Sequence, residues 1–330
     1  MKYILTLITF FVFINNSSIS AWSTDFELYQ NESIPSNIRD EIKVINDKIF
    51  DCIENRNPDI FFNEILSDSL RKRAGYELKS LIQQLSMTYD HKGYNIKDEF
   101  YTPLIDHKQV INLIGDINTN YEYSLNIGIG KRDSYFSLLT FNDNTIMVGL
   151  LYRKREGKWQ LDFIGVNQYS IKNKLPYDYY MLSINDLKKG HLIDAALYAS
   201  LSTVGLKPNN AFTYSKEQEI LSHSTMLDSI IKSKYIFPIT VEELETKPQI
   251  FQVTPQIVDE GIFPMVNYLT KINISDTIQL RIENEQMKKI IGDIFPGIDK
   301  EKEFVFYTAH DNIPTQQGIL NVYGFVQKIE

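Results

Sequence analysis

The spacing of apolar residues changes in the first half of the chain from the period of a helix to that of a strand. Over residues 36–54 apolar residues recur at steps of three and four, which predicts one buried helix face. Over residues 121–129 apolar and polar residues alternate, which predicts a half-buried strand. The helical face consists of Ile38, Ile42, Ile45, Ile49, Cys52 and Ile53. Helices followed by strands indicate an α+β fold, with helices on one face of a curved antiparallel sheet.

Local signals define the other elements of this region. Ser36 is expected to cap the first helix, and Asn57 followed by Pro58 predicts a new helix start. A third helix is expected over about 76–88. The remaining predicted strands are 134–141, 145–154 and 158–166, with a turn at Asn142-Asp143-Asn144 between the first two.

This element order resembles the NTF2-like (cystatin-like) superfamily over residues 36–170. The resemblance rests on the order itself, on the helix start Asn57-Pro58-Asp59, and on the late strand Gly157-Lys158-Trp159-Gln160-Leu161. Such domains form a cone whose open end often holds a small ligand. Some members are enzymes and many are binding or accessory modules, so the fold alone assigns no activity.

In such a cone, aromatic residues and an acid from the strands line the cavity. The resemblance therefore implies Tyr123, Tyr135, Trp159 and Asp162 as ligand-binding candidates. A buried Asp162 with a raised pKa would serve as a general base. Trp159 and Asp162 are three positions apart, so a regular strand points them to opposite faces. This spacing favours the alternative of a core aromatic cluster and a solvated acid.

The second half predicts two further parts. Helices over 178–189 and 191–205 meet at Gly190 and resemble one tetratricopeptide helical hairpin. Because no second copy is visible, we interpret the pair as a connector. Residues 212–330 predict a second, smaller α+β domain. Its elements are a helix from Ser215 to Ile231, strands 249–257 and 262–272, a helix from Asp276 to Ile294, and strands 303–308 and 322–328. Prolines 248, 255 and 264 are expected to confine the first two stretches to sheet edges or to short strands.

The first 21 residues are typical of a secretory signal peptide. Lys2 precedes an apolar run from Ile4 to Ile14, and small residues follow at Ser18–Ala21. The run is too short to span a bilayer. We therefore expect an exported protein, periplasmic or extracellular. The predicted division is 1–21 signal peptide, 25–175 NTF2-like domain, 176–211 helical hairpin and 212–330 C-terminal domain.

Composition argues against several function classes. The net charge is −8 and no basic block occurs, which argues against nucleic acid as a partner. No second apolar span follows the signal region, so no integral membrane segment is expected after its removal. The single cysteine, Cys52, lies on an apolar helix face and predicts a buried residue. The five histidines are scattered, so neither a metal site nor a cofactor is expected.

These observations favour an exported, non-catalytic binding or accessory protein that binds a small apolar ligand or an envelope protein. The alternative is an NTF2-like enzyme, an isomerase, dehydratase or hydrolase, that uses Asp162 and a pocket tyrosine. An exported effector is a third hypothesis, which the residues do not separate from the first.

Overall fold

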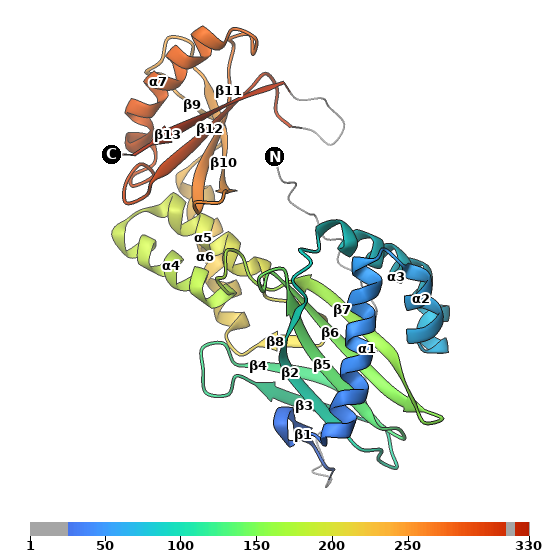
Figure 1. Cartoon of the computed structure of the whole chain (residues 1–330). Coiled ribbons are helices and arrows are strands. Elements are labelled where there is room, and N and C mark those ends of the chain that lie inside the picture. The colour runs from blue at the N-terminus through green and yellow to red at the C-terminus, as the bar shows by residue number, and fades with distance from the viewer. Residues whose placement is uncertain (1–25, 315–320, 330) are drawn as a thin grey trace. The chain divides into compact units, whose positions relative to one another are not determined.

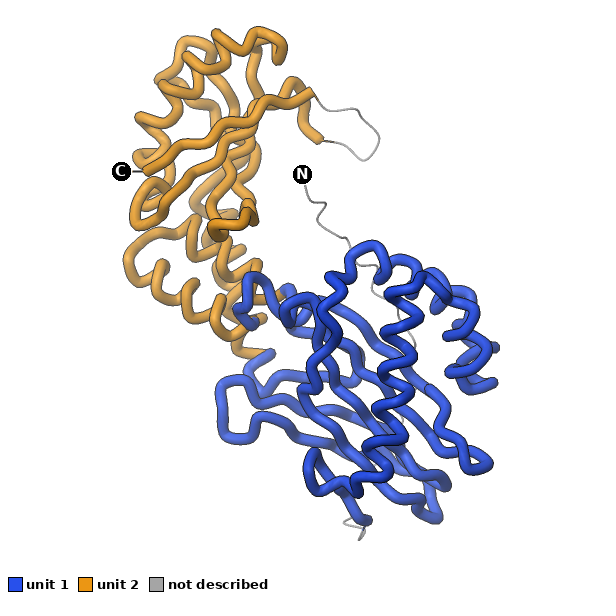
Figure 2. Tube along the Cα trace, in the orientation of Figure 1, with its two compact units in different colours: residues 1–175, 204–217 blue, residues 176–203, 218–330 orange. Residues whose placement is uncertain are grey.

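The computed structural model of the chain describes residues 26–314 and 321–329 (Figure 1). The predicted signal peptide lies outside them. The chain divides into two compact units, residues 1–175 with 204–217 (unit 1) and residues 176–203 with 218–330 (unit 2), as Figure 2 shows. The fold is α+β with several sheets, as the sequence predicted. The two predicted connector helices group with the C-terminal region, whereas the segment 204–217 groups with unit 1.

Unit 1 contains a helical layer and two sheets. Its helices are α1 (Ser36–Glu54), α2 (Pro58–Ile60) and α3 (Asp68–Thr88), with short helical turns η1 (Asn31–Ser33) and η2 (Phe61–Ile65). Its strands are β1 (Tyr29–Gln30), β2 (Tyr94–Thr102), β3 (Gln109–Gly115), β4 (Tyr123–Ile129), β5 (Ser134–Phe141), β6 (Ile146–Arg155), β7 (Lys158–Gln168) and β8 (Phe212–Tyr214). Sheet A has the order β1-β2-β5-β6-β7, and sheet B has the order β3-β4-β8.

The helix starts depend on local capping. Asn57 caps α2 as predicted, because its side chain accepts a hydrogen bond from the backbone nitrogen of Ile60 at 3.3 Å. The prediction for Ser36 is wrong: Ser36 is already helical, and Pro35 occupies the capping position without a side-chain hydrogen bond. Helix α3 begins earlier than the predicted residue 76, because Ser67 caps it by accepting from the Leu70 nitrogen at 3.2 Å.

Sheet A is covered on both faces. The predicted apolar face of α1 packs with α3 and with sheet A in one core cluster, which includes Ile42, Ile49 and Leu150 (Figure 1). On the other face, side chains of both sheets line one small cavity, among them Phe136 of sheet A and Ile127 of sheet B. Every residue of the central strand β5 is consequently buried.

Unit 2 contains four helices and a third sheet. The helices are α4 (Pro176–Lys189), α5 (Leu192–Val204), α6 (Glu217–Lys234) and α7 (Thr277–Ile294). The strands are β9 (Ile239–Thr240), β10 (Gln249–Ile257), β11 (Ile262–Leu269), β12 (Phe304–His310) and β13 (Val322–Lys328). They form sheet C in the order β13-β12-β11-β10-β9. Strands β11 and β12 are parallel, and α7 provides the crossover that a parallel pair requires.

The prolines of sheet C correct one expectation. Pro255 and Pro264 lie in the interior strands β10 and β11, opposite each other, and not in edge strands. They are tolerated because the pairing with the outer strands, β9 and β12, does not extend to them. Strand β9 pairs only with Gln249 and Ile250, and the pairing of β11 with β12 begins at Met265. Each proline therefore lies where no outer partner needs its missing N–H.

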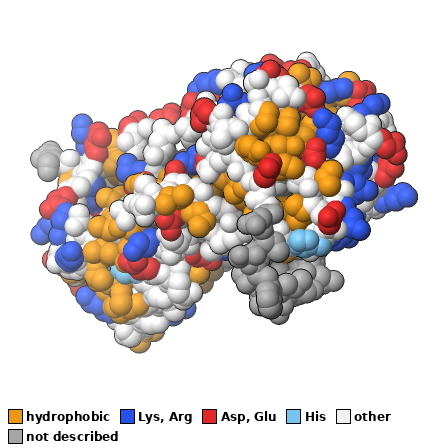
Figure 3. All heavy atoms as spheres, turned by 90° about the horizontal axis from the view of Figure 1, so that it is seen from below, with side chains coloured by type: hydrophobic (Ala, Val, Ile, Leu, Met, Phe, Trp, Pro, Cys, Tyr) orange, Lys and Arg blue, Asp and Glu red, His pale blue; other side chains and the backbone are white. Residues whose placement is uncertain are grey.

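Within the described ranges, no helix combines the length and apolar character that crossing a bilayer requires. On the face drawn in Figure 3, acidic and basic side chains are interspersed and neither sign forms a continuous block.

The Ser67 cap generates a test of unit 1. The Ser67→Ala variant removes two interactions of a fully buried side chain, the acceptor of the Leu70 N–H and the hydrogen bond to Asp162. We expect a loss of about 1 kcal/mol in the free energy of unfolding of unit 1, measured by chemical denaturation. Ser69→Ala is the control for the neighbouring hydroxyl, which lies 3.3 Å from Ser67 Oγ but caps no backbone nitrogen. Equal losses in the two variants would contradict the capping role.

Candidate functional site

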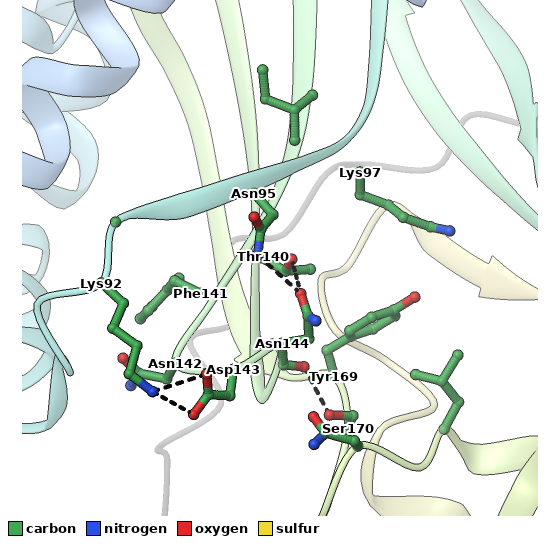
Figure 4. A pocket seen from close by; sticks show the side chains of 14 residues that line it. Lys92, Asn95, Lys97, Thr140, Phe141, Asn142, Asp143, Asn144, Tyr169 and Ser170 are labelled. Carbon is green, nitrogen blue, oxygen red and sulfur yellow. Dashed lines mark hydrogen bonds and ion pairs between the residues drawn. The ribbon is translucent and has the colours of Figure 1, made fainter.

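A pocket of about 650 Å³ lies at one end of sheet A (Figure 4). Its walls come from the start of β2, the turn between β5 and β6, and the segment that follows β7. Its volume falls within the range of about 300–1,000 Å³ that is usual for ligand sites. Most of its lining side chains are polar: Lys92, Asn95, Lys97, Thr140, Asn142, Asp143, Asn144, Tyr169, Ser170 and Asn173.

The turn at the pocket has an unusual backbone. Asn142, Asp143 and Asn144 have φ values of 52°, 53° and 62°, so all three are left-handed. Most residues avoid this conformation, but the short polar side chains of Asn and Asp tolerate it. The sequence predicted a turn here, and its composition explains how the chain reverses within so few residues.

Hydrogen bonds hold this turn in place. The Asn142 side chain accepts from the Asp90 nitrogen at 2.9 Å and donates to the Thr88 oxygen at 2.8 Å. The Asn144 Oδ1 atom accepts from Thr140 at 2.6 Å, and the Asn144 backbone oxygen accepts from Ser170 at 2.8 Å. The turn is therefore tied to three neighbouring segments, which presents a preformed rim to the pocket.

Both lysines of the pocket are already paired. Lys92 Nζ lies 2.8 Å from Asp143 Oδ2, and Lys97 Nζ lies 2.6 Å from Asp116 Oδ2. Figure 4 shows Lys92 with Asp143 on one side of the pocket and Lys97 beside Tyr169 on the other. Because each ammonium group has its own carboxylate, the pocket offers little net charge to a ligand.

Several amide groups of the pocket remain available. Within the described part of the chain, no hydrogen bond is formed by Asn144 Nδ2, by Asn95 Oδ1 or by the Asn173 side chain. These groups supply both donors and acceptors. Apolar contact is provided by Ile96, which is 48% exposed, and by Leu175.

Two of the four predicted site residues lie together, but away from this pocket. Tyr135 and Trp159 have ring centroids 6.2 Å apart, and Tyr101 packs against both. Trp159 Nε1 donates to Glu41 Oε2 at 2.7 Å, and Tyr135 is fully buried. This cluster belongs to the core between the helices and sheet A.

Tyr123 lies elsewhere in unit 1. Its ring stacks on Phe212 with centroids 4.4 Å apart, and its hydroxyl donates a hydrogen bond to Asp98. Asp98 also accepts from the side chain of Asn31 at 3.0 Å. Burial, the charge of Asp98 and this hydrogen bond raise the pKa of Tyr123 far above its usual value. Tyr123 therefore remains neutral and pins β4 to β2.

Asp162 is neither solvated nor a general base with a raised pKa. It lies at a β-bulge, because Leu161 and Phe163 pair with consecutive residues of β6 and Asp162 has no partner in register. The bulge breaks the expected alternation, so Asp162 and Trp159 are both buried. Arg155 Nη2 and Arg153 Nη1 lie 2.6 and 3.2 Å from its Oδ2.

The surroundings of Asp162 decide its ionisation. Burial alone would raise the pKa, but the hydrogen bonds from Arg155 and Ser67 and the charges of both arginines outweigh it and hold the pKa below its usual value. A carboxylate that two arginines keep ionised is a poor proton acceptor at neutral pH. The geometry therefore does not favour the enzyme alternative based on Asp162.

Sequence reasoning missed a different acid, Glu99. Its side chain is 4% exposed, and burial raises its pKa, an effect that Tyr135 and the charge of Arg39 oppose in part. Because Glu99 and Tyr135 are both enclosed in the core, a substrate has no surface on which to reach them, and we assign them a structural role. Cys52 is also buried, as predicted, and burial raises its pKa.

The asparagine-rich turn is the one part of the pocket that local sequence indicates. The asparagine-rich turn was identified only as a turn, although it forms part of the wall. Asn95 and Tyr169 carried no signal, because their approach depends on how β2 and β7 end beside that turn.

No group of three or more potential metal ligands occurs in the described ranges. Comparisons with family models, with curated proteins and with solved structures found no match to this chain.

The left-handed turn generates a paired test. Asn144→Gly and Asn144→Ala both lose the hydrogen bond from Thr140, but only alanine is strained at a φ of 62°. We expect the alanine variant to be less stable than the glycine variant by about 1 kcal/mol in chemical denaturation. An alanine variant as stable as the glycine variant would show that the backbone there is relaxed.

The Asp162 ion pairs generate a pH prediction. The pKa of Asp162 is lower in the folded chain than its usual 3.8, so its contribution is complete above that value and is lost as the pH falls through the folded pKa. Asp162→Asn leaves both arginines without their carboxylate, and we expect a loss of about 3 kcal/mol at pH 7.

The measurement is urea denaturation of both proteins from pH 7 to pH 2. The stability difference between them should shrink as the pH falls below 4. A difference that stays constant over this range would rule out the ion pairs as its source.

Proposed function

We propose that this protein is exported and acts as a non-catalytic binding protein. In this proposal unit 1 is of the NTF2-like type, and its pocket at the β5–β6 turn binds a neutral, hydroxyl-rich molecule such as a saccharide. The element order supports the NTF2-like type of unit 1, because α1, α2 and α3 precede a meander of antiparallel strands and cover one face of it. Unit 1 also carries sheet B on the other face of that meander.

The ligand class follows from two observations. Both lysines of the pocket are paired with carboxylates, and the Asn144 Nδ2 and Asn95 Oδ1 groups have no partner among the described residues. A pocket for an anion would keep a cation free, but Lys92 and Lys97 are each neutralised by a carboxylate. A pocket for an apolar ligand would not be lined mainly by amides and hydroxyls. The lining therefore favours a polar ligand over the small apolar ligand or the envelope protein expected from the sequence.

Hydroxyl groups match this lining better than other neutral groups. A sugar hydroxyl both donates and accepts, so it matches the Asn144 Nδ2 donor, the Asn95 Oδ1 acceptor and both groups of the Asn173 amide. Ile96 supplies an apolar surface for the C–H faces of a sugar ring. Because the turn is held by hydrogen bonds, its polar groups are ordered before binding, which reduces the entropic cost.

We expect neutral mono- or oligosaccharides to bind the purified mature protein in a glycan array, with the affinity of each hit measured by calorimetry. Asn95→Ala removes one acceptor, and a weakening of about tenfold is expected. Asn126→Ala, which changes an exposed asparagine of β4 outside the pocket, is the control and should bind normally.

Two outcomes would contradict the proposal. One is the absence of saccharide binding by folded protein across the array. The other is binding that Asn95→Ala and Asn126→Ala leave equally unchanged, since this would place the ligand outside the pocket.

A further inference from the structure

A second pocket, of about 180 Å³, lies within unit 2. Its walls come from α4, the turn at His191, α5, the start of β11 and the segment before β12. The side chains of Asp186, His191, Asp194 and Lys302 that line it are only 9–16% exposed. Four titratable groups so deeply placed in one small pocket are costly to bury, which makes the pocket a candidate functional site.

Most of the charges in this pocket cancel in pairs. Lys302 Nζ donates to Asp194 Oδ2 at 2.5 Å and to the Gly297 oxygen at 3.1 Å. Lys189 Nζ donates a hydrogen bond to Glu301. These two pairs leave one lining carboxylate, Asp186, without a hydrogen bond of its own.

Asp186 is the lining carboxylate that has ion-pair partners but no hydrogen bond. Lys189 Nζ and His191 Nδ1 lie 3.9 and 4.0 Å from its Oδ1, within ion-pair range but beyond hydrogen-bond distance. Among the described residues no side chain or backbone donor is hydrogen-bonded to this carboxylate. Burial raises its pKa, an effect that the charges of Lys189, Lys302 and His191 oppose. An ammonium donor from a ligand would complete its hydrogen bonding.

Lys300 is the unmatched cation. It lines the same pocket, its side chain is exposed, and in the ranges that the structure describes it has no ion pair. A ligand carboxylate would form an ion pair with the ammonium group of Lys300.

The His191 ring packs closely against the backbone at Gly297. Gly297 has a φ of 89°, and a Cβ atom there would lie 2.1 Å from the His191 ring. Glycine at position 297 thus lets the imidazole pack directly on the backbone. This contact fixes His191 beside the carboxylate of Asp186.

Apart from Tyr198, the rest of the lining is aliphatic or aromatic without a polar group: Leu182, Leu197, Ile262, Phe263 and Pro264. We propose that this pocket binds a small zwitterion, an α-amino acid with an apolar side chain. Its ammonium group pairs with Asp186, its carboxylate with Lys300, and its side chain contacts the apolar wall. The pocket is smaller than the roughly 300 Å³ at which sites for drug-sized ligands begin, which limits the occupant to a molecule of this size.

Other ligand classes fit the charges less well. A phosphate ion would face the carboxylates of Asp186, Asp194 and Glu301, and a metal ion would face the ammonium groups of Lys300 and Lys302. A zwitterion would donate a hydrogen bond to Asp186, which has none, and would give Lys300 the ion pair that it lacks among the described residues. The inference is independent of the pocket in unit 1.

The test measures, by calorimetry, the affinity of the purified protein for L-leucine, 4-methylpentanoate and 3-methylbutylamine. The last two lack the ammonium group and the carboxylate of leucine, respectively. We expect leucine to bind and each analogue to bind at least tenfold more weakly. L-valine, L-isoleucine and L-phenylalanine define the size limit of the pocket.

Two variants locate the binding. Asp186→Asn and Lys300→Gln should each weaken leucine binding at least tenfold. Asp228→Asn and Lys232→Gln make the same charge changes in an exposed pair on α6 and should leave it unchanged. Because the pKa of Asp186 is raised, its charge does not stabilise the fold, and we expect Asp186→Asn to remain folded.

Three results would overturn the inference. The first is that none of the four amino acids binds to folded protein at millimolar concentration. The second is that an analogue binds as well as leucine. The third is that inorganic phosphate binds in the pocket and Asp186→Asn does not weaken leucine binding.

Discussion

Burial of β5 on both faces is the constraint from which the rest of unit 1 follows. None of its eight residues reaches solvent appreciably, so both faces of the strand need a covering layer. The helices α1 and α3 provide one layer and sheet B the other. Polar groups that this burial encloses must find partners inside. The Tyr152 hydroxyl donates to Asn46 Oδ1 at 2.6 Å, and the Asn46 amide donates to Ser137 of β5 at 3.4 Å.

The same constraint locates the polar pocket. Over its length sheet A is enclosed, so exposed polar groups are concentrated where its strands end. At the β5–β6 turn, left-handed Asn and Asp residues turn their backbone into the next strand and use their side chains to bind neighbouring segments. The two roles of asparagine in this turn, conformational tolerance and hydrogen bonding, explain why a rigid rim forms beside the pocket.

The two units treat buried charge differently. In unit 1, Asp162 is enclosed with two arginines whose hydrogen bonds keep it ionised, and the group serves the structure. In unit 2, Asp186 is enclosed without a hydrogen bond, and its pKa is raised. A buried carboxylate that the fold does not hydrogen-bond can accept a hydrogen bond from a ligand, whereas Asp162 Oδ2 is already occupied by the two arginines.

Local signals predicted much of the secondary structure. The strands 134–141, 249–257 and 322–328 have the predicted bounds, and α1 and α7 follow their apolar spacing. The sequence patterns do not predict strands β1, β2, β3, β8 and β9. Strand β3 alternates polar and apolar residues only briefly, and β8 has three residues that pair solely because β4 lies beside them. The extent of these strands depends on distant partners more than on local periodicity.

The candidate sites were less accessible to sequence reasoning. Aromatic residues on predicted strands suggested Tyr135 and Trp159, and the structure does bring them together, but as core. The bulge at Asp162 could not be foreseen, because one extra residue reverses which face a side chain takes and leaves no periodic trace.

The sequence by itself determined the α+β class, the helix faces, most strand positions and the asparagine turn, since each depends on neighbours within a few residues. Only the tertiary structure decided which charges meet. Asp186 and Lys300 are more than a hundred positions apart, yet they line one pocket of unit 2. The two lysines of the unit 1 pocket are neutralised by carboxylates from other segments. Charge pairing acts through space over a few ångströms, and the linear order of residues does not encode those distances.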